Sequence, residues 1–363
     1  MARIFGLSTE SDNLRNLDFL RFIASLAIVY HHSHEYFIHT EERTAVFTRS
    51  VGLGLFVDLF FMISGFVIAY AYEARIGSTA EYLRFLWRRV ARLYPLHLVV
   101  LALNIALWAI LLSRGSSDSA PSFSPDCIAA TTLLVQEYVD CGSSIHFNGV
   151  TWSISVEMGM YILMPAFMLL ARLGNGWLAA ATASAIALAA FFTPPGGEWL
   201  GSPHLLRGLA GFATGYLLFR IRDRIPDFRY AAIGVPVLCI AALVAIFSSA
   251  PQALSLSLLA ALMVVSISAD QNGKILPVLE KACPLGQLTY SIYLWHTLFI
   301  LALINVVADK LFYGNIPILI AATALCYASI FLASYAGYWL IEVPGRRLLA
   351  GLAAPAWKNR QAT

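Results

Sequence analysis

Apolar stretches of 17 residues or more recur from end to end of this chain, and no other feature constrains its fold as strongly. Each stretch is long enough to cross a hydrocarbon core of about 30 Å as a helix. Of the 363 residues, 59% are hydrophobic and 12% are charged, and that charged fraction is about half the value of an ordinary soluble domain. The sequence therefore predicts an all-α polytopic membrane protein surrounded by a lipid bilayer.

Ten segments are predicted to span the membrane as transmembrane helices. They are 16–37, 51–72, 95–113, 151–171, 177–193, 204–219, 231–249, 252–269, 286–308 and 317–341. An eleventh candidate, 126–139, is shorter and contains Gln136 and Glu137, so the distribution of positive charge has to decide whether it crosses.

Positive charge sets the expected orientation, because Lys and Arg are retained on the cytoplasmic side of membrane proteins. The arginine-rich connections 73–94 and 220–230 should both lie there, which requires an even number of crossings between them. Four spans already meet that requirement, so 126–139 is predicted not to cross. With both termini cytoplasmic, 19 of the 24 Lys and Arg fall on or near the cytoplasmic side.

In this topology the long loop 114–150 lies outside, with 126–139 as an interfacial or re-entrant helix within it. Loops of this length are usually functional. Cys127 and Cys141 both lie in the loop, on the oxidising side of a bacterial inner membrane. A disulfide between them is one hypothesis, and two unpaired thiols are the other. Residues 1–345 are expected to form one integral-membrane domain, followed by a basic cytoplasmic tail at 346–363.

The first span carries ionisable residues at membrane depth, where they are costly and normally face a cavity or a partner. Arg21 and His32 are 11 residues apart, which brings them to nearly the same helical face about 16 Å apart along the axis. One face thus has a cation near the cytoplasmic boundary and a candidate base deeper toward the outer side. The alternatives are snorkelling of Arg21 to the headgroups beside Asp18, and a hydrogen-bonded structural role for His32.

Two carboxylates are expected at a depth similar to that of His32. Asp58 lies about 10 Å along the second span, and Glu157 in WSISVE lies about 9 Å along the fourth, both counted from the outer side. The three side chains are therefore expected to share one cavity, where a carboxylate beside His32 would orient the imidazole of a general base. A structural hydrogen bond to a neighbouring helix is the alternative for each carboxylate.

A cluster of arginines in RRVARLYP precedes the third span on the predicted cytoplasmic side. Arg89 and Arg92 are three residues apart on one helical surface, with Arg88 beside them. Guanidinium groups suit phosphate oxygens, so Arg88, Arg89 and Arg92 are candidate phosphate ligands. Ordinary anchoring by positive charge at the cytoplasmic boundary is the alternative.

Five motifs together resemble acyltransferase family 3, a group of bacterial integral-membrane enzymes that O-acylate surface sugars and some secondary metabolites. They occur in the family's order across nearly the whole chain: NLDFLRFIASLAIVYHH, FFMISGF, RRVARLYP, WSISVE and TYSIYLWH. The family's pattern of an arginine, ten residues and a histidine falls on Arg21 and His32. Its RxxR pattern falls on Arg89 and Arg92.

The resemblance implies a membrane-bound O-acyltransferase of the bacterial cytoplasmic (inner) membrane. Its expected co-substrate is acyl-CoA, most commonly acetyl-CoA, with no permanently bound cofactor and no metal. In the implied mechanism Arg89 and Arg92 bind the phosphates of the CoA nucleotide, with Arg21 and Arg88 as further candidates. The pantetheine arm then runs outward and brings the thioester toward His32.

The resemblance also implies how the acyl group is transferred. His32 removes a proton from a carbohydrate hydroxyl, which attacks the thioester carbonyl, while Glu157 or Asp58 positions the imidazole or the sugar. Direct transfer is the preferred interpretation, because no serine or cysteine of the sequence is clearly paired with a base. Ser64 is the best candidate nucleophile if the reaction instead passes through an acyl-enzyme.

Trp152, His296 and Arg207 are the candidate contacts of the carbohydrate acceptor. For Trp152 the alternative role is anchoring at the membrane interface. For His296 the equally supported alternative is a structural hydrogen bond. The runner-up function is a transporter or flippase of a polysaccharide intermediate, with intramembrane His, Asp and Glu side chains as a proton relay. The net charge of +3 does not argue for a nucleic-acid partner, and the sequence leaves open whether the chain forms a homo-oligomer.

Overall fold

The computed structural model describes residues 3–4, 6–8, 14–34, 50–115, 120–141, 146–195, 197–312 and 315–352, and nearly all of them are helical. The exception to the predicted all-α fold is an antiparallel pair of two-residue strands, β1 (Arg3–Ile4) and β2 (Leu7–Ser8). Gly6 makes their turn with a φ of +76°, a backbone conformation that favours glycine.

Fourteen α-helices lie within the described residues: α1 (Arg15–His34), α3 (Phe56–Tyr72), α4 (Thr79–Ser113), α5 (Pro125–Thr132), α6 (Thr151–Ile162), α7 (Met164–Leu173), α8 (Asn175–Phe191), α9 (His204–Ile221), α10 (Ala231–Phe247), α11 (Gln252–Gln271), α12 (Pro277–Ala282), α13 (Thr289–Phe299), α14 (Ile316–Gly337) and α15 (Val343–Leu352). Short 3-10 segments are η2 (Val51–Leu55), η3 (Glu73–Arg75), η4 (Gln136–Tyr138), η5 (Trp199–Gly201), η6 (Arg222–Arg224) and η7 (Cys283–Leu288). Two segments are π-helical: η8 (Ile300–Leu311) and η9 (Tyr338–Glu342).

Several helices are long and apolar enough to cross a membrane, as the sequence predicts for a multi-pass protein. Among the described residues there are five such segments, and a sixth if α6 and α7, bent by 50° at their junction, form one span. Pro165 in the first turn of α7 accounts for the bend, since proline cannot continue a helix without losing a backbone hydrogen bond. The count of ten spans and the cytoplasmic position of both termini stay predictions.

Helix α4 is longer than the sequence indicates, because the expected connection before the third span is itself helical. The helix begins at Thr79, where the Ser78 hydroxyl accepts from the backbone N–H of Glu81 at 3.3 Å. The Glu81 carboxylate in turn accepts from the Ser78 hydroxyl at 3.1 Å, so this helix start is closed by reciprocal hydrogen bonds. Pro95, where the span was expected to begin, lies inside the helix.

The segment 126–139 folds as two short pieces, α5 and η4. Helix α5 has eight residues and is therefore about 12 Å long, much shorter than a hydrocarbon core of about 30 Å. Leu134, between the two pieces, has a φ of +57° and breaks the helix. This geometry agrees with the prediction that 126–139 does not cross.

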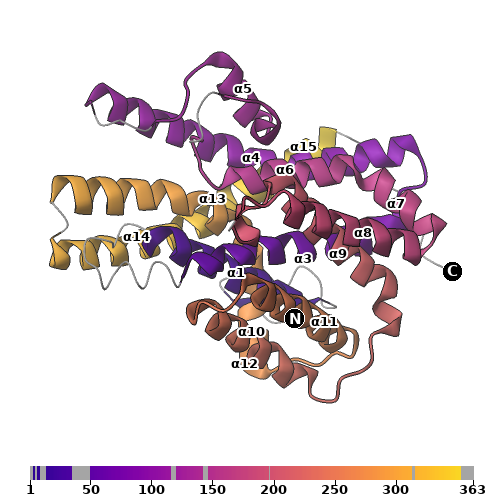
Figure 1. Ribbon diagram of the computed structural model, residues 1–363. Helices are drawn as coiled ribbons and strands as arrows, with labels where there is room; N and C mark the ends of the chain where they lie inside the picture. The colour runs from indigo at the N-terminus through magenta and orange to yellow at the C-terminus, as the bar shows by residue number, and fades with distance from the viewer. Residues whose placement is uncertain are drawn as a thin grey trace.

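Helices α1 and α3 occupy the middle of the molecule (Figure 1). Helix α3 packs along α9, and α1 packs against α3, α11, α13 and η7. Helices α10 and α11 pair on one side, while α13 and α14 pair on another (Figure 1). The two helices that carry Arg21, His32 and Asp58 are therefore interior.

Glycines let the backbones of α3 and α9 touch. A Cβ at Gly65 would overlap the carbonyl oxygen of Phe212, and a Cβ at Gly215 would overlap the carbonyl oxygen of Met62. Gly215 and Gly211 form a GxxxG spacing, the small-residue pattern that allows close packing of membrane helices. The contact fixes the rotation of α3 about its axis, and with it the direction of every α3 side chain.

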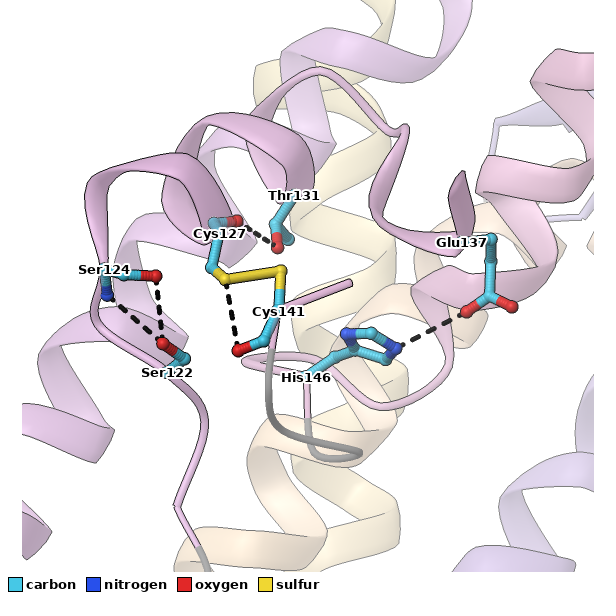
Figure 2. The surroundings of a disulfide bond; sticks show 7 residues. All are labelled: Ser122, Ser124, Cys127, Thr131, Glu137, Cys141 and His146. Atoms are coloured by element: carbon cyan, nitrogen blue, oxygen red, sulfur yellow. Dashed lines mark hydrogen bonds and ion pairs between the residues drawn. A yellow bond between two sulfur atoms is a disulfide. The ribbon is translucent and has the colours of Figure 1, made fainter. Parts of the chain in front are cut away.

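The loop between α4 and α6 contains the disulfide that the sequence left open. Cys127 of α5 is bonded to Cys141, which follows η4 (Figure 2). The bond ties α5 to Cys141, and the imidazole of His146 lies beside Glu137 of η4 (Figure 2). The other three cysteines, Cys239, Cys283 and Cys326, are free and buried.

The α3–α9 contact makes a first testable prediction. Gly215→Ala should destabilise the folded protein by about 1–3 kcal/mol, because the added methyl group has no room beside the Met62 carbonyl. Thermal unfolding in detergent, followed by size-exclusion chromatography, measures the change. Gly176→Ala in α8, where a Cβ meets no atom within 4 Å, is the matched control and should be neutral. Equal midpoints for the two variants would contradict the predicted contact.

The disulfide makes a second prediction, on the number of reactive thiols. Protein denatured without reductant and treated with an alkylating reagent should gain three adducts, because two of the five cysteines are bonded to each other. Prior reduction should raise the number to five. Intact mass spectrometry counts the adducts, and five adducts without reduction would show that the bond is absent.

Candidate active site

A cavity of about 150 Å³ lies where α1, α3, α4, α6, η7 and α13 meet. Its wall is apolar except for a group of charged and hydroxyl side chains that come from five of these elements. We call it the arginine cavity, and its main polar side chains are Arg21, Ser64, Arg89, Arg92, Glu157, Tyr161 and Tyr293. The structure thus brings the predicted phosphate ligands of α1 and α4 together with one of the two predicted carboxylates.

Arg89 is held by aromatic side chains at the cavity wall. Its Nη2 donates to the Tyr72 hydroxyl at 2.8 Å, and its guanidinium lies over the rings of Tyr72 at 5.0 Å and Tyr161 at 5.9 Å. Among the described residues, its buried Nε has no hydrogen-bond partner. Arg92 lines the same cavity one turn further along α4, whereas Arg88 is not among the lining residues. Of the three predicted α4 ligands, two therefore face the cavity.

Arg21 reaches the cavity from the first turns of α1. Its Nη1 donates to Asp18 Oδ1 at 3.1 Å, so the predicted pairing with Asp18 is present and Arg21 also lines the cavity. The start of α1 is held by Asp270 of α11. Asp270 Oδ1 accepts from the backbone N–H of Asn16 at 2.8 Å, and Oδ2 accepts from that of Leu17 at 3.3 Å. These bonds cap the helix and set the position of Arg21 relative to the cavity.

Glu157 lies in the cavity as predicted, and its neighbours are hydroxyl groups. Its Oε1 accepts a hydrogen bond from the Ser64 hydroxyl and another, at 2.6 Å, from the Tyr161 hydroxyl. Tyr161 follows Glu157 by four residues on α6, a spacing that places two side chains on one helical face. Sequence reasoning missed Tyr161, although that spacing would have found it.

His32 lies outside the arginine cavity, beside other histidines. Its ring centroid is 4.9 Å from that of His31 and 5.2 Å from that of His296. His32 Nδ1 lies 3.0 Å from the Ile28 carbonyl oxygen, an acceptor, so Nδ1 carries the proton in this contact. The Nε2 atom of His32 then keeps its lone pair, as a general base requires.

His296 and Tyr293 lie between His32 and the arginine cavity. The His296 ring is 5.7 Å from the ring of Tyr293, which lines the cavity. His296 is fully buried, with Nδ1 3.2 Å from the Ile292 carbonyl oxygen, and among the described residues its Nε2 has no hydrogen-bond partner. The structure thus places His296 next to the predicted base.

Asp58 pairs with Arg207 and is not brought to His32 or Glu157. Arg207 Nη2 and Nε donate to the two oxygens of Asp58 at 2.6 Å and 3.3 Å, and both side chains are almost fully buried. Asp58 is seven residues before Gly65, so both lie on the face of α3 that meets α9. Depth along the helix was predicted for Asp58, but the direction of its side chain depends on this packing. The predicted common cavity therefore contains Glu157 without Asp58 or His32.

Trp152 packs against Arg207, the member of this ion pair that lies on α9. Its ring stacks on His204 with centroids 4.0 Å apart, and the Arg207 guanidinium lies over it at 5.4 Å. Neither Trp152 nor Arg207 lines the arginine cavity. Both predicted acceptor contacts are engaged with protein side chains in this structure.

A second polar group, which sequence reasoning did not find, joins the loop between α4 and α6 to α9. We call it the loop cluster: Glu137 of η4, His146 and His204. Glu137 Oε2 lies 2.8 Å from His204 Nδ1, and Oε1 lies 3.4 Å from His146 Nε2. Burial raises the pKa of Glu137, but hydrogen bonds and positive charge from the two imidazoles outweigh it and lower that pKa to about 2. The cluster unites residues distant in sequence, so no local pattern indicates it.

Comparisons with known proteins agree with the motifs. A family model described as an acyltransferase domain matches residues 14–337. Acyltransferase MdmB of Streptomyces mycarofaciens is 27% identical over 375 aligned residues, covering 93% of this chain and 92% of that protein. Exopolysaccharide production protein ExoZ of Rhizobium meliloti is 26% identical over 330 aligned residues, covering 83% and 93%. No solved structure matches the chain.

The loop cluster predicts a pH dependence. Because the pKa of Glu137 is about 2 in the folded protein and 4.5 is its reference value, its contribution to stability is present above about pH 4.5. That contribution should be lost as the pH falls toward 2. The thermal midpoint should therefore drop more steeply between pH 5 and pH 2 in the wild type than in Glu137→Gln. Glu198→Gln, at an exposed carboxylate, is the control and should follow the wild type; parallel curves for all three would contradict the prediction.

Proposed function

The chain belongs to acyltransferase family 3, and from that premise we propose that it transfers an acetyl group from acetyl-CoA to a hydroxyl group of a carbohydrate. The observation that carries the proposal is the arginine cavity. It joins a site suited to the phosphates of a nucleotide with hydroxyl and carboxylate groups suited to acyl chemistry.

The arginines support a CoA donor. Arg21, Arg89 and Arg92 come from two helices and line one cavity, whereas anchoring at a membrane surface would need no such convergence. The Nε of Arg89, which has no hydrogen-bond partner among the described residues, adds a buried donor, and guanidinium forks bind phosphate oxygens in pairs. We assign these three side chains to the phosphates of the CoA nucleotide, with the thioester directed toward Ser64 and Glu157.

His32 is the proposed base for the acceptor. Its bond from Nδ1 to the Ile28 carbonyl leaves Nε2 as a proton acceptor, and His296 beside it keeps a second Nε2 lone pair. Two neighbouring imidazoles of this kind share and pass on a proton. The acceptor hydroxyl loses its proton to His32 as it attacks the acyl carbonyl, which is general-base catalysis.

A carbohydrate acceptor is supported by the relatives. ExoZ, whose alignment covers 83% of this chain, is named for exopolysaccharide production. We propose a related acceptor for this chain, presented at the outer side of the bacterial inner membrane. The loop cluster and the Trp152–His204 stack lie on the predicted outer side, where such an acceptor would arrive.

The proposal is tested by separating donor binding from transfer. In nanodiscs with radiolabelled acetyl-CoA, Arg89→Ala should weaken donor binding at least tenfold, about 1.4 kcal/mol, because it removes a guanidinium from the cavity. His32→Ala should bind donor normally and lose about 10²–10⁴-fold in transfer to a crude polysaccharide acceptor, because the base is gone. Filter binding and CoA release measure the two steps.

Matched controls come from the neighbouring residues. Arg88→Ala removes the same charge next to Arg89 but outside the cavity, so it should weaken binding much less. His31→Ala removes an imidazole next to His32 and should keep most of the transfer activity. Equal losses of donor binding in Arg88→Ala and Arg89→Ala would indicate that the arginines serve only as membrane anchors. An unchanged transfer rate in His32→Ala would show that His32 is not the base.

A further inference from the structure

The hydrogen bond between Ser64 and Glu157 gives the arginine cavity a feature that direct transfer does not use. The Ser64 hydroxyl donates to Glu157 Oε1 inside the cavity that also holds the three arginines. A hydroxyl bonded to a carboxylate, at the place where an acyl donor would bind, is the arrangement of a nucleophile with its base.

We propose that Ser64 receives the acyl group first, as an acyl-serine ester, before the group passes to the acceptor. The inference rests on the proposed function, because it needs an acyl-CoA bound in the arginine cavity. It assigns to Ser64 the role of nucleophile and to Glu157 the role of its base.

The packing of α3 holds Ser64 in place for this role. Gly65 faces the Phe212 carbonyl of α9 so closely that no side chain fits there. Ser64, one residue earlier and about 100° around the helix, is thereby turned away from that contact toward Glu157 of α6. The nucleophile is thus positioned by the backbone contact between two helices, which leaves little freedom to rotate out of the cavity.

Tyr161 shares the same carboxylate oxygen, but its surroundings favour Ser64 as the nucleophile. The Tyr161 side chain is 4% exposed, and its ring is packed against Phe85 and lies beneath the Arg89 guanidinium. Ser64 is less buried and lies on the cavity wall. The Tyr161 hydroxyl, which donates at 2.6 Å, instead fixes Glu157 Oε1 beside the serine.

The position of His32 explains why a covalent intermediate is useful. His32 lies outside the cavity, beyond Tyr293 and His296, so the donor site and the proposed acceptor base are separate. An ester on Ser64 retains the acyl group after CoA has left. The acceptor hydroxyl can then be activated in a second step, without both large substrates being bound at once.

The first half-reaction forms an ester and releases CoA. The Ser64 Oγ attacks the thioester carbonyl while its proton moves to Glu157, and the tetrahedral adduct then breaks its C–S bond. The departing sulfur takes the proton from Glu157, which leaves acyl-Ser64, free CoA thiol and an ionised Glu157. No oxidant, reductant or further reactant is needed.

The second half-reaction transfers the acyl group to the acceptor. The acceptor oxygen attacks the carbonyl of acyl-Ser64 and gives its proton to His32. The bond between the acyl carbon and Ser64 Oγ then breaks, and Ser64 Oγ takes up a proton from solvent by way of Glu157, its hydrogen-bond partner, while His32 releases to solvent the proton that it took from the acceptor. The products are the acylated carbohydrate and the free enzyme.

The experiment uses the full-length protein in nanodiscs with radiolabelled acetyl-CoA and no acceptor. After denaturation in SDS, the wild type should retain covalent label, and peptide mass spectrometry should find an added acetyl group on Ser64. Ser64→Ala should bind acetyl-CoA as the wild type does, but reduce the covalent label to less than about a tenth and the transfer rate by about 100-fold or more. His32→Ala should keep the label and fail to pass it on when acceptor is added.

Two variants make the assignment specific. Ser25→Ala changes a buried serine of α1 that bonds the Phe22 carbonyl and does not line the cavity, so it should keep the label. Ser64→Cys should form a thioester in place of the ester, which changes the label from one that resists neutral hydroxylamine to one that is released by it. The changed sensitivity to hydroxylamine identifies residue 64 as the acylated position, even if the alanine variant folds poorly.

Several outcomes would overturn the inference. Transfer by Ser64→Ala at the wild-type rate, or wild-type transfer with no covalent label at any time, would show direct transfer and leave the proposed function standing. Label that persists in Ser64→Ala and is lost in Tyr161→Phe would assign the nucleophile to the tyrosine instead. A wild-type protein that neither binds acetyl-CoA nor transfers the acetyl group would overturn the proposed function together with this inference.

Discussion

The backbone contact between α3 and α9 is the constraint on which the rest of the site depends. Gly65 and Gly215 remove the side chains that would separate the two helices, so α3 has one permitted rotation about its axis. At the far end of the same contact, Asp58 and Arg207 form a buried ion pair that would be costly to break. Rotation of α3 would overlap atoms at one end and expose an unpaired charge at the other.

This rotation divides the polar side chains of α3 between two tasks. Asp58 faces α9 and holds the bundle together, while Ser64 faces α6 and meets Glu157. Glu157 accepts hydrogen bonds from Ser64 and Tyr161, whereas Asp58 pairs with Arg207. Two acidic residues at a similar predicted depth thus have different partners, which the neighbouring helices decide.

The sequence predicts well the helical membrane fold and the positions of Arg89, Arg92 and Glu157. Each of these follows from the residues of one helix alone. Apolar length indicates a span, and RxxR spacing puts Arg89 and Arg92 on one face. It predicts the pairing of Asp58 poorly, because depth along an axis says nothing about which neighbour a side chain meets. The sequence placed the start of the third span at Pro95 and did not show that one continuous helix, α4, runs from Thr79 through this proline, which Gly345 of α15 contacts from a distant part of the chain.

The charged side chains that line the arginine cavity relate the fold to the proposed acyl donor. Arg21, Arg89 and Arg92 line the cavity together with Glu157, and Arg21 is paired with Asp18 at 3.1 Å. Excess charge inside a membrane protein is expensive and is normally balanced by a partner. Asp58 and Arg207 meet this requirement by pairing with each other. The buried Nε of Arg89, which has no hydrogen-bond partner among the described residues, is a donor that an anionic ligand would satisfy. Under the proposed function, a phosphate of the CoA nucleotide is that ligand, and the thioester then lies near Ser64 and Glu157.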